Sequence, residues 1–396
     1  MADRYDQTTS IIRDAAVREL VERGHSLFTM ESVAKRSYSS VGSVYARFSN
    51  RTELLSDILH SKVLPSLREL RDHGPAGTEA LLRQVFGDPS LGANLHSLVE
   101  IALASRVHAD LVDGVREGLG LIHDSFHLSG DDQTLVKGLR HDLTAVVLGF
   151  FVLVGAGCSV PPLSADLAHV VELMLSGEPP VDTMVLRALP ARVIIEPPIV
   201  VEPQRDQVAN ALIDATGEVL AESGLEGAHL RDIAKRAGVS TGALYRRYRS
   251  KSELLNDGLV REMNNDKNGW TGQFIEALLA EPTGRQAAEM MASKIKASVE
   301  DPVRLLAGIE ILQAARADEL MRQTIATQVH AAANDRSRML EELVGAGIVH
   351  DNVSPSLFGW LPQIRPAGER LLVMMGLKSD DRVLVHSLQA YLRLLV

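Results

Sequence analysis

Cysteine is almost absent from this sequence. Cys158 is the single cysteine among 396 residues, so a framework of disulfides within the chain is excluded. That composition fits a reducing compartment. The N-terminal residues 1–20 include acidic side chains and have no apolar run ahead of a cleavage site, so we expect no signal peptide. The expected location is the cytoplasm.

Long apolar runs are also scarce. Residues 143–158 form the one stretch that suggests a membrane segment, but it is shorter than the roughly 20 residues that a spanning helix needs. Pro161 and Pro162 follow it directly. We therefore expect a buried core or interface helix there, and no membrane association.

Patterns for catalysis or cofactor binding are missing. The sequence has no zinc-protease, phosphate-loop, nucleophile-elbow or paired-cysteine motif. His123 and His127 have a spacing that can hold a metal, but no third ligand follows nearby. Gly155 and Gly157 follow no strand, so they are not a dinucleotide-binding loop. The sequence predicts a protein that is not an enzyme and that holds no cofactor and no metal.

Positive charge is in deficit overall but concentrated in two places. The formal net charge is −10, whereas residues 229–255 contain seven Lys or Arg against two acids. The corresponding window 29–55 contains four against two. A local basic region on an acidic protein is typical of a small nucleic-acid footprint.

The two basic windows belong to an internal repeat. Between residues 14 and 57 the chain matches itself at an offset of 200 without a gap, which indicates two copies of one unit. The pairs include Asp14/Asp214, Gly24/Gly224, Ser40/Ser240, Gly42/Gly242, Tyr45/Tyr245, Arg47/Arg247, Glu53/Glu253 and Asp57/Asp257. Further along, Glu100 and Arg106 recur as Glu310 and Arg316, and we interpret each Glu and Arg as ion-pair or capping partners within their own copy.

Apolar residues recur at helical spacing through both copies, and no run alternates with the period of a strand. Gly24 and Gly224 are helix C-cap signals at the end of each first helix. Asn50 with Glu53, and Ser250 with Glu253, have the spacing of a capping box that starts a fourth helix. The predicted fold class is all-α.

Residues 230–255 have the pattern of a helix-turn-helix. One helix spans 231–237, Gly238 supplies a left-handed turn, and Ser240 caps a second helix from Thr241 to about Tyr248. Leu244 and Tyr248 share the inward face of that second helix. Gly242 and Arg246 lie on the outward face, a small and basic surface that fits a DNA groove.

The first copy keeps this pattern with substitutions. Tyr38 stands at the turn position of Gly238, where a left-handed tyrosine costs on the order of 1 kcal/mol or bends the turn another way. Arg51 stands in place of Lys251, which lies in the first turn of the next helix, where free N–H groups favour a phosphate. At the outward face Val41, Ser43 and Ala46 replace Thr241, Ala243 and Arg246.

The second copy closely resembles the tetracycline-repressor (TetR) family of transcription regulators. The residues that carry the resemblance are Ile233, Ala234, Ala237, Gly238, Val239, Ser240, Gly242, Leu244, Tyr245, Tyr248, Lys251, Glu253, Leu254 and Leu255. The resemblance implies that Thr241, Gly242, Ala243 and Tyr245 lie at the groove and that Arg247 and Lys251 contact phosphates.

The complete predicted DNA-binding set spans both copies: Thr241, Gly242, Ala243, Tyr245, Arg246, Arg247 and Lys251, with Val41, Gly42, Ser43, Tyr45, Arg47 and Arg51. Two alternatives stay open. The tyrosines Tyr45 and Tyr245 would also fit as core aromatics, and Arg246, Arg247 and Arg249 would also fit as a solvated face.

The resemblance also implies a small DNA-binding domain followed by a helical effector and dimerisation domain in each unit. The predicted divisions are residues 1–58 and 59–177 for the first unit, a Pro-rich connector at 178–206, and 207–257 and 258–396 for the second unit.

The predicted function is a sequence-specific DNA-binding regulator, a repressor relieved by an unknown small-molecule effector. Its partners are double-stranded DNA and that effector. Because the two units are fused, we expect an intramolecular pseudo-dimer on an asymmetric operator, with half-site centres about 34–36 Å apart or a multiple of that distance. Further homodimerisation is left open.

One alternative is that only the second helix-turn-helix binds DNA and chains pair in trans. Another is an interaction protein that sequesters partners and binds DNA weakly.

Overall fold

A computed structural model describes residues 2–177, 205–261 and 284–395. Every regular element in these ranges is a helix, so the predicted all-α class is confirmed. The predicted connector lies outside the described residues except at its end, residues 205 and 206. The division of the chain into domains stays a prediction, and the helical run from Arg51 to His73 passes through the boundary expected at residue 58.

The described part of the first unit, residues 2–177, contains thirteen short and long helical elements. They are α1 (Ala2–Arg23), η1 (His25–Leu27), α2 (Met30–Arg36), α3 (Val41–Tyr45), α4 (Arg51–Ile58), η2 (Leu59–Val63), α5 (Leu64–His73), α6 (Thr78–Gly87), α7 (Pro89–Ala104), η3 (Ala109–Leu111), α8 (Val112–Ser125), α9 (Gln133–Gly155) and α10 (Ser164–Ser176). We term residues 2–58 the first head and 59–177 the first body.

The second unit repeats this plan. Its helices are α11 (Gln207–Gly227), α12 (Leu230–Arg236), α13 (Thr241–Tyr245), a helix at 251–261, α15 (Gly284–Glu300), α16 (Pro302–Ala317), α17 (Glu319–Gly345), α18 (Pro355–Met374) and α19 (Asp381–Leu395). We term residues 205–261 the second head and 284–395 the second body.

The predicted helix-end signals are found in the structure, except that α11 resumes after Gly224 and runs to Gly227. Gly24 follows α1 with φ 73°, and Gly224 interrupts α11 with φ 68°, a backbone region that favours glycine. At the fourth helix of each head, the Glu53 amide donates to Asn50 Oδ1 (2.9 Å) and the Glu253 amide donates to Ser250 Oγ (3.1 Å). The glutamate side chains accept from the amides of residues 49 and 249, one residue before each cap.

The apolar stretch at 143–158 lies mainly in α9. Among the described helices, α9 is the one long and apolar enough to cross a membrane by length and composition, and 61% of that apolar window is buried inside the protein. It packs against α7 and α8 of its own body and against α18 and α19 of the other. This placement agrees with the expected core or interface helix.

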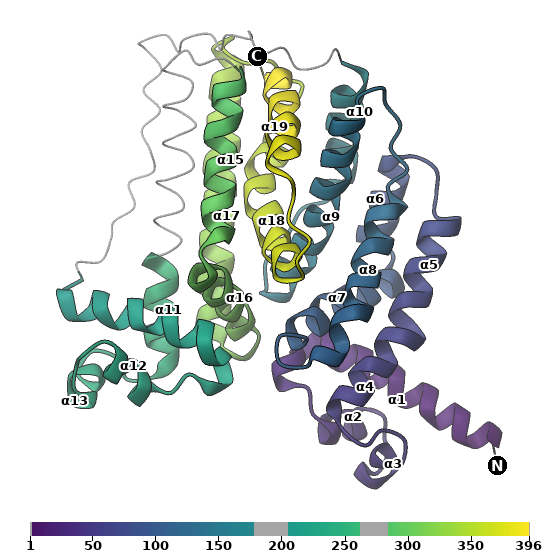
Figure 1. Cartoon of the computed structure of the whole chain (residues 1–396), viewed down its shortest axis with the longest axis vertical. Helices are drawn as coiled ribbons and strands as arrows, with labels where there is room; N and C mark the ends of the chain where they lie inside the picture. Colours follow the sequence, from purple (N-terminus) through teal and green to yellow (C-terminus); the bar gives the residue numbers. More distant parts are fainter. Residues whose placement is uncertain (1, 178–204, 262–283, 396) are drawn as a thin grey trace.

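The two bodies meet along α9 and α18. Gly149 and Gly368 bring the two backbones together: a Cβ added at Gly149 would lie 1.8 Å from the Ile364 carbonyl oxygen, and one at Gly368 1.8 Å from the Ala145 oxygen. Asp142 pairs with Arg365 across the same contact (2.7 Å). With the bodies packed in this way, both heads lie at the same end of the molecule's long axis (Figure 1). Helices α2 and α3 lie on one side of that end, and α12 and α13 lie on the other.

Candidate nucleic-acid interface

The helix-turn-helix of the second head is built from local backbone chemistry. Gly238 adopts φ 69°, and the Val239 amide then reaches back to the Ala234 carbonyl (3.0 Å) to close the turn. Ser240 Oγ accepts from the Ala243 amide (3.1 Å) and so starts α13. Leu244 anchors α13 in the core, where it is fully buried.

We term the second helix of each helix-turn-helix, α3 in the first head and α13 in the second, the recognition helix, and it is shorter than the sequence suggested. We expected the second one to run to about Tyr248, but α13 ends at Tyr245, as α3 ends at Tyr45. The Arg247 amide donates to the Leu244 carbonyl (2.9 Å), three residues back, which tightens the chain into a turn after the helix. Tyr248 still faces inward and is buried.

The outward face of each recognition helix is open to solvent. Tyr245 is 54% exposed and Tyr45 is 46% exposed, so the alternative that they are core aromatics is wrong. Thr241, Gly242 and Arg246 are exposed as well, and Val41 and Gly42 are exposed in the first head. Ala243 and Ser43 are half-buried at the edge of this face.

The first head keeps the turn despite its tyrosine. Tyr38 has φ 52°, and it is the one residue other than glycine with positive φ in the described chain. Its side chain is 99% exposed and packs on nothing. Of the two outcomes expected at this position, the chain adopts the strained left-handed turn rather than a different bend.

The predicted phosphate-contacting arginines are engaged within the protein. The Arg47 guanidinium lies 4.2 Å from the centroid of the Tyr5 ring, and its Nη1 donates to the Ser43 carbonyl (2.8 Å). Arg247 forms an ion pair with Asp206, the residue that caps α11. Both side chains tie the recognition helix to the first helix of the head, and their phosphate contacts stay predictions.

Lys251 and Arg51 also point toward the protein. Lys251 Nζ donates to the Leu225 carbonyl, and Arg51 Nη2 donates to the equivalent carbonyl of His25. Each residue therefore links the start of the fourth helix to the turn after the first helix. Lys251 and Arg51 thus form equivalent hydrogen bonds at equivalent positions of the repeat. The internal repeat alone did not predict this contact.

Comparison with known proteins matches both heads. Residues 12–58 and 212–257 match the family described as bacterial regulatory proteins, tetR family. The chain carries two tetR-family domains in tandem. The remaining length of each unit lies outside these matches.

Individual relatives support the same assignment over parts of the chain. The HTH-type transcriptional regulator PksA of Bacillus subtilis (strain 168) is 46% identical over 54 residues, 14% of this chain and 24% of that protein. An uncharacterized HTH-type transcriptional regulator of Mycobacterium tuberculosis (strain ATCC 25618 / H37Rv) is 27% identical over 140 residues, 35% of this chain and 69% of that protein. The HTH-type transcriptional repressor KstR of Mycolicibacterium smegmatis is 31% identical over 99 residues, 25% of this chain and 46% of that protein.

Each tetR-family head rests on a buried glutamate from its own body. Glu100 on α7 accepts from the His25 amide (2.7 Å), and Glu310 on α16 accepts from the Leu225 amide (2.7 Å). Both amides follow the glycine that ends the first helix of the head. The turn at each helix end is thus fixed by a carboxylate that reaches over from the body.

The arginines that neutralise these carboxylates come from the opposite unit. Arg316 pairs with Glu100 (2.7 Å) and Arg106 pairs with Glu310. The expectation that Glu100 pairs with Arg106 and Glu310 with Arg316 is therefore wrong, because the interface between the bodies brings each arginine nearer to the other copy's glutamate.

This network shifts the pKa of two buried groups. Burial tends to raise the pKa of Glu100, but Arg316 and His25 outweigh it and lower that pKa to about 2. Burial and the neighbouring charge of Arg316 lower the pKa of His96 to about 4. Neutral His96 accepts a hydrogen bond from Arg316 through Nε2, so no second positive charge lies beside the guanidinium.

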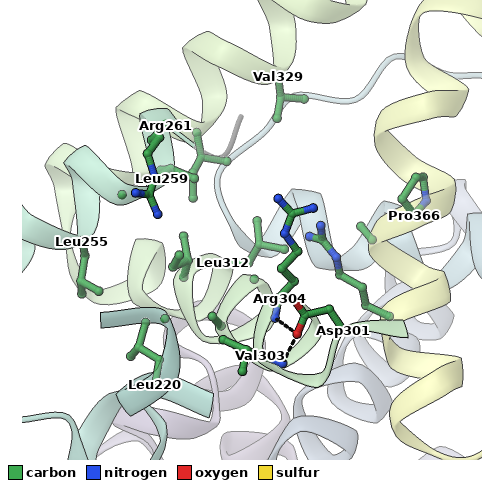
Figure 2. Close-up of a pocket in the computed structure, with 18 of the residues that line it drawn as sticks. Leu220, Leu255, Leu259, Arg261, Asp301, Val303, Arg304, Leu312, Val329 and Pro366 are labelled. Atoms are coloured by element: carbon green, nitrogen blue, oxygen red, sulfur yellow. Dashed lines mark hydrogen bonds between the residues drawn. The ribbon is translucent and has the colours of Figure 1, made fainter. Parts of the chain in front are cut away.

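A cavity of about 840 Å³ lies in the second unit between its head and its body. Its walls come from α11, from the helix at 251–261 and from α16, α17 and α18, and they include Leu259, Leu312 and Val329 (Figure 2). The cavity is mainly apolar but is also lined by Arg261, Arg304, Arg336 and Arg370. Asp214 pairs with Arg261 (2.6 Å), whereas the Nε of Arg370 is buried with no hydrogen-bond partner among the described residues.

The two histidines considered as metal ligands each have another polar neighbour. His123 contacts Asp124 (3.1 Å), and His127 Nε2 lies 3.2 Å from the Arg71 carbonyl oxygen. Within the residues that the structure describes, no group of three or more His, Cys, Asp or Glu is arranged to hold a metal ion.

Proposed function

We propose that this protein is a sequence-specific DNA-binding transcriptional regulator whose two heads bind two unlike half-sites of one operator. The observation that carries the proposal is the pair of exposed recognition helices at one end of a single chain, each on a tetR-family domain (Figure 1). Three positions of the recognition helix differ between the heads. Val41, Ser43 and Ala46 of the first head correspond to Thr241, Ala243 and Arg246 of the second. Since such side chains contact base edges, the two half-sites differ in sequence.

The two units act as a pseudo-dimer in cis. Tethering raises the effective concentration of one unit near the other, so a single chain presents both heads without a second chain. The close packing of α9 on α18 supports this arrangement. The protein acts as a cytoplasmic repressor in this proposal, and one relative is a named repressor.

Binding-site selection with the full chain tests the unlike half-sites. The expected product for the parent protein is a site with two different halves. The triple variant Val41→Thr, Ser43→Ala, Ala46→Arg gives the first recognition helix the second one's outward side chains, and it should select an inverted repeat. An inverted repeat from the parent protein contradicts the proposal.

Mobility shifts on the selected site separate the alternatives. Tyr45→Ala and Tyr245→Ala should each weaken binding of the whole operator. Loss from Tyr245→Ala alone, with two chains per operator, favours pairing in trans through the second head. Absence of binding at any salt concentration favours a sequestering protein.

DNA binding is relieved by a ligand in the second-unit cavity. The volume of the cavity suits a small molecule, and its walls join the head to the body, so an occupant changes the balance between two head positions. The apolar walls, together with the buried Nε of Arg370, which has no hydrogen-bond partner among the described residues, favour an apolar molecule that carries one acidic group.

Calorimetry with decanoate as the probe, and decan-1-ol as its neutral control, tests the ligand class. Decanoate should bind more tightly than the alcohol and should weaken operator binding, and Arg370→Gln should remove the difference. Equal affinity for both probes contradicts the acidic class, while the DNA-binding proposal is judged by the site selection alone.

A further inference from the structure

The two buried glutamates form equivalent networks that cross between the units. Arg316 reaches from the second body to Glu100 and also donates to the Val21 carbonyl of the first head (3.0 Å). Arg106 reaches from the first body to Glu310 and donates to the Ala221 carbonyl of the second head (3.4 Å). Val21 and Ala221 are equivalent positions in the repeat, at the offset of 200. Each contact from the second unit to the first therefore has an equivalent contact in the opposite direction.

Each network continues from the arginine into the helix-turn-helix. Arg316 holds Glu100, whose Oε2 accepts from the His25 amide; the carbonyl of that same residue accepts from Arg51 at the start of α4. The peptide groups of one residue thus join the opposite body to the fourth helix of the head.

The second head repeats the path with different residues. Arg106 holds Glu310, whose Oε2 accepts from the Leu225 amide, and the Leu225 carbonyl accepts from Lys251. The residue that receives both bonds is a histidine in one head and a leucine in the other, so the shared element is the backbone peptide and not the side chain.

Burial makes these glutamates dependent on the opposite unit. Glu100 is 1% exposed and Glu310 is 6% exposed, and a carboxylate out of water requires a counter-charge. In both cases a guanidinium of the other unit supplies it. If the bodies shift relative to each other, the arginine moves away and the carboxylate loses its position under the head.

We infer that Arg316 and Arg106 are positioning residues that act crosswise, Arg316 fixing the orientation of the first head and Arg106 that of the second. The consequence for the operator rests on the proposed DNA-binding function, whereas the consequence for the heads themselves does not. Movement at the α9–α18 contact is thereby transmitted to both heads, each through the arginine of the opposite body.

Hydrogen exchange of the full chain without DNA tests the crosswise assignment. Arg316→Gln should speed exchange of the His25 amide and the neighbouring first head by roughly tenfold or more, and leave the second head unchanged. Arg106→Gln should do the reverse, with Leu225 as the reporting amide. Arg338→Gln, which alters an exposed arginine paired with Asp335, is the matched control and should change neither head.

A paired variant separates positioning from general loss of structure. In Glu100→Gln with Arg316→Gln, no buried charge is left alone and the glutamine oxygen can still accept from the His25 amide, so exchange at His25 should recover part of its protection. A change in the head of the arginine's own unit, an equal change in both heads, or no change in either overturns the inference.

Footprinting on the two-half-site operator extends the test to DNA. Arg316→Gln should weaken protection of the half-site bound by the first head, and Arg106→Gln that of the other half-site. Weakening of the half-site on the arginine's own unit overturns the crosswise assignment. If the parent protein binds no DNA, the proposed function fails, and the exchange experiment still decides the inference.

Discussion

Gly242 and Gly42 occupy the outward face of their recognition helices without any conformational need for glycine. Neither has a positive φ, and a Cβ at Gly242 would meet only Ser240 Oγ, at 3.9 Å. We expect Gly242→Ala to leave the protein as stable or more stable by up to ~1 kcal/mol, because alanine favours helix.

The same variant should weaken operator binding by about 1–3 kcal/mol, since the added methyl group holds the helix away from the groove. Thermal unfolding and a mobility shift on one preparation check both halves. Gly42→Ala is the matched variant in the first head. Unchanged DNA affinity in both would contradict a groove-facing role for these glycines.

The backbone of Tyr38 is strained, and no contact of its side chain compensates for that strain. Its left-handed backbone costs about 1 kcal/mol or more relative to glycine, and its exposed side chain offsets none of it. Tyr38→Gly should therefore stabilise the first head by roughly 0.5–1 kcal/mol, after the larger unfolded-state entropy of glycine is included. Denaturant midpoints of this variant and of the reciprocal Gly238→Tyr should move in opposite directions.

At the scale of elements, α7 and α16 do more than pack against the heads. Each begins with an Asp–Pro cap, at Asp88 and Asp301, and each carries its glutamate to the end of a head's first helix. The recognition helix itself is only five residues long, so its orientation is set by the elements around it and not by its own stability.

His96 on α7 should make the stability of the folded protein depend on pH. Its pKa is about 4 in the folded protein against an ordinary 6.5, so between these values the unfolded chain binds a proton that the folded chain does not. Stability should therefore fall as the pH drops from about 6.5 to about 4, by about 3 kcal/mol from this residue. Glu100, with a pKa of about 2, adds a further loss below pH 4.5.

Urea unfolding as a function of pH measures this loss. His96→Gln should remove the part of the slope between pH 6.5 and 4 and keep the part below it. A slope that is identical in the parent protein and in the variant would show that the histidine is protonated in the folded state.

At the scale of the whole molecule, the distance between the heads depends on the contact of α9 with α18. Gly149→Ala places a methyl group within 1.8 Å of the Ile364 carbonyl oxygen, so the helices must move apart at a cost of about 1–3 kcal/mol or more. Gly120→Ala, on α8, meets nothing within 4 Å and is the control.

Gly149→Ala should weaken binding to the two-half-site operator, because the spacing of the heads changes, whereas Gly120→Ala should not. Affinity for a single half-site should be the same in both variants and in the parent protein. Fluorescence anisotropy with both DNAs measures the difference. Equal loss on the single half-site would place the effect inside a head and not between the units.

The sequence by itself determined what is decided within a few residues of backbone. The left-handed turn at Gly238, the C-caps at Gly24 and Gly224 and the inward face of α13 follow from local sterics and helical periodicity, and all are found in the structure. The repeat fixed two equivalent heads. Even here the end of α13 was placed three residues too late, since a tight turn and a helix have the same apolar spacing over so short a length.

Only the tertiary structure decided which charges meet. Arg106 is close to Glu100 in the chain, and we expected the two to pair within one unit. In the packed molecule each arginine pairs with the glutamate of the opposite unit. The cavity beside Arg370 is likewise bounded by helices far apart in the chain. These partners depend on how two finished units pack, a relation that periodicity and local propensity do not encode.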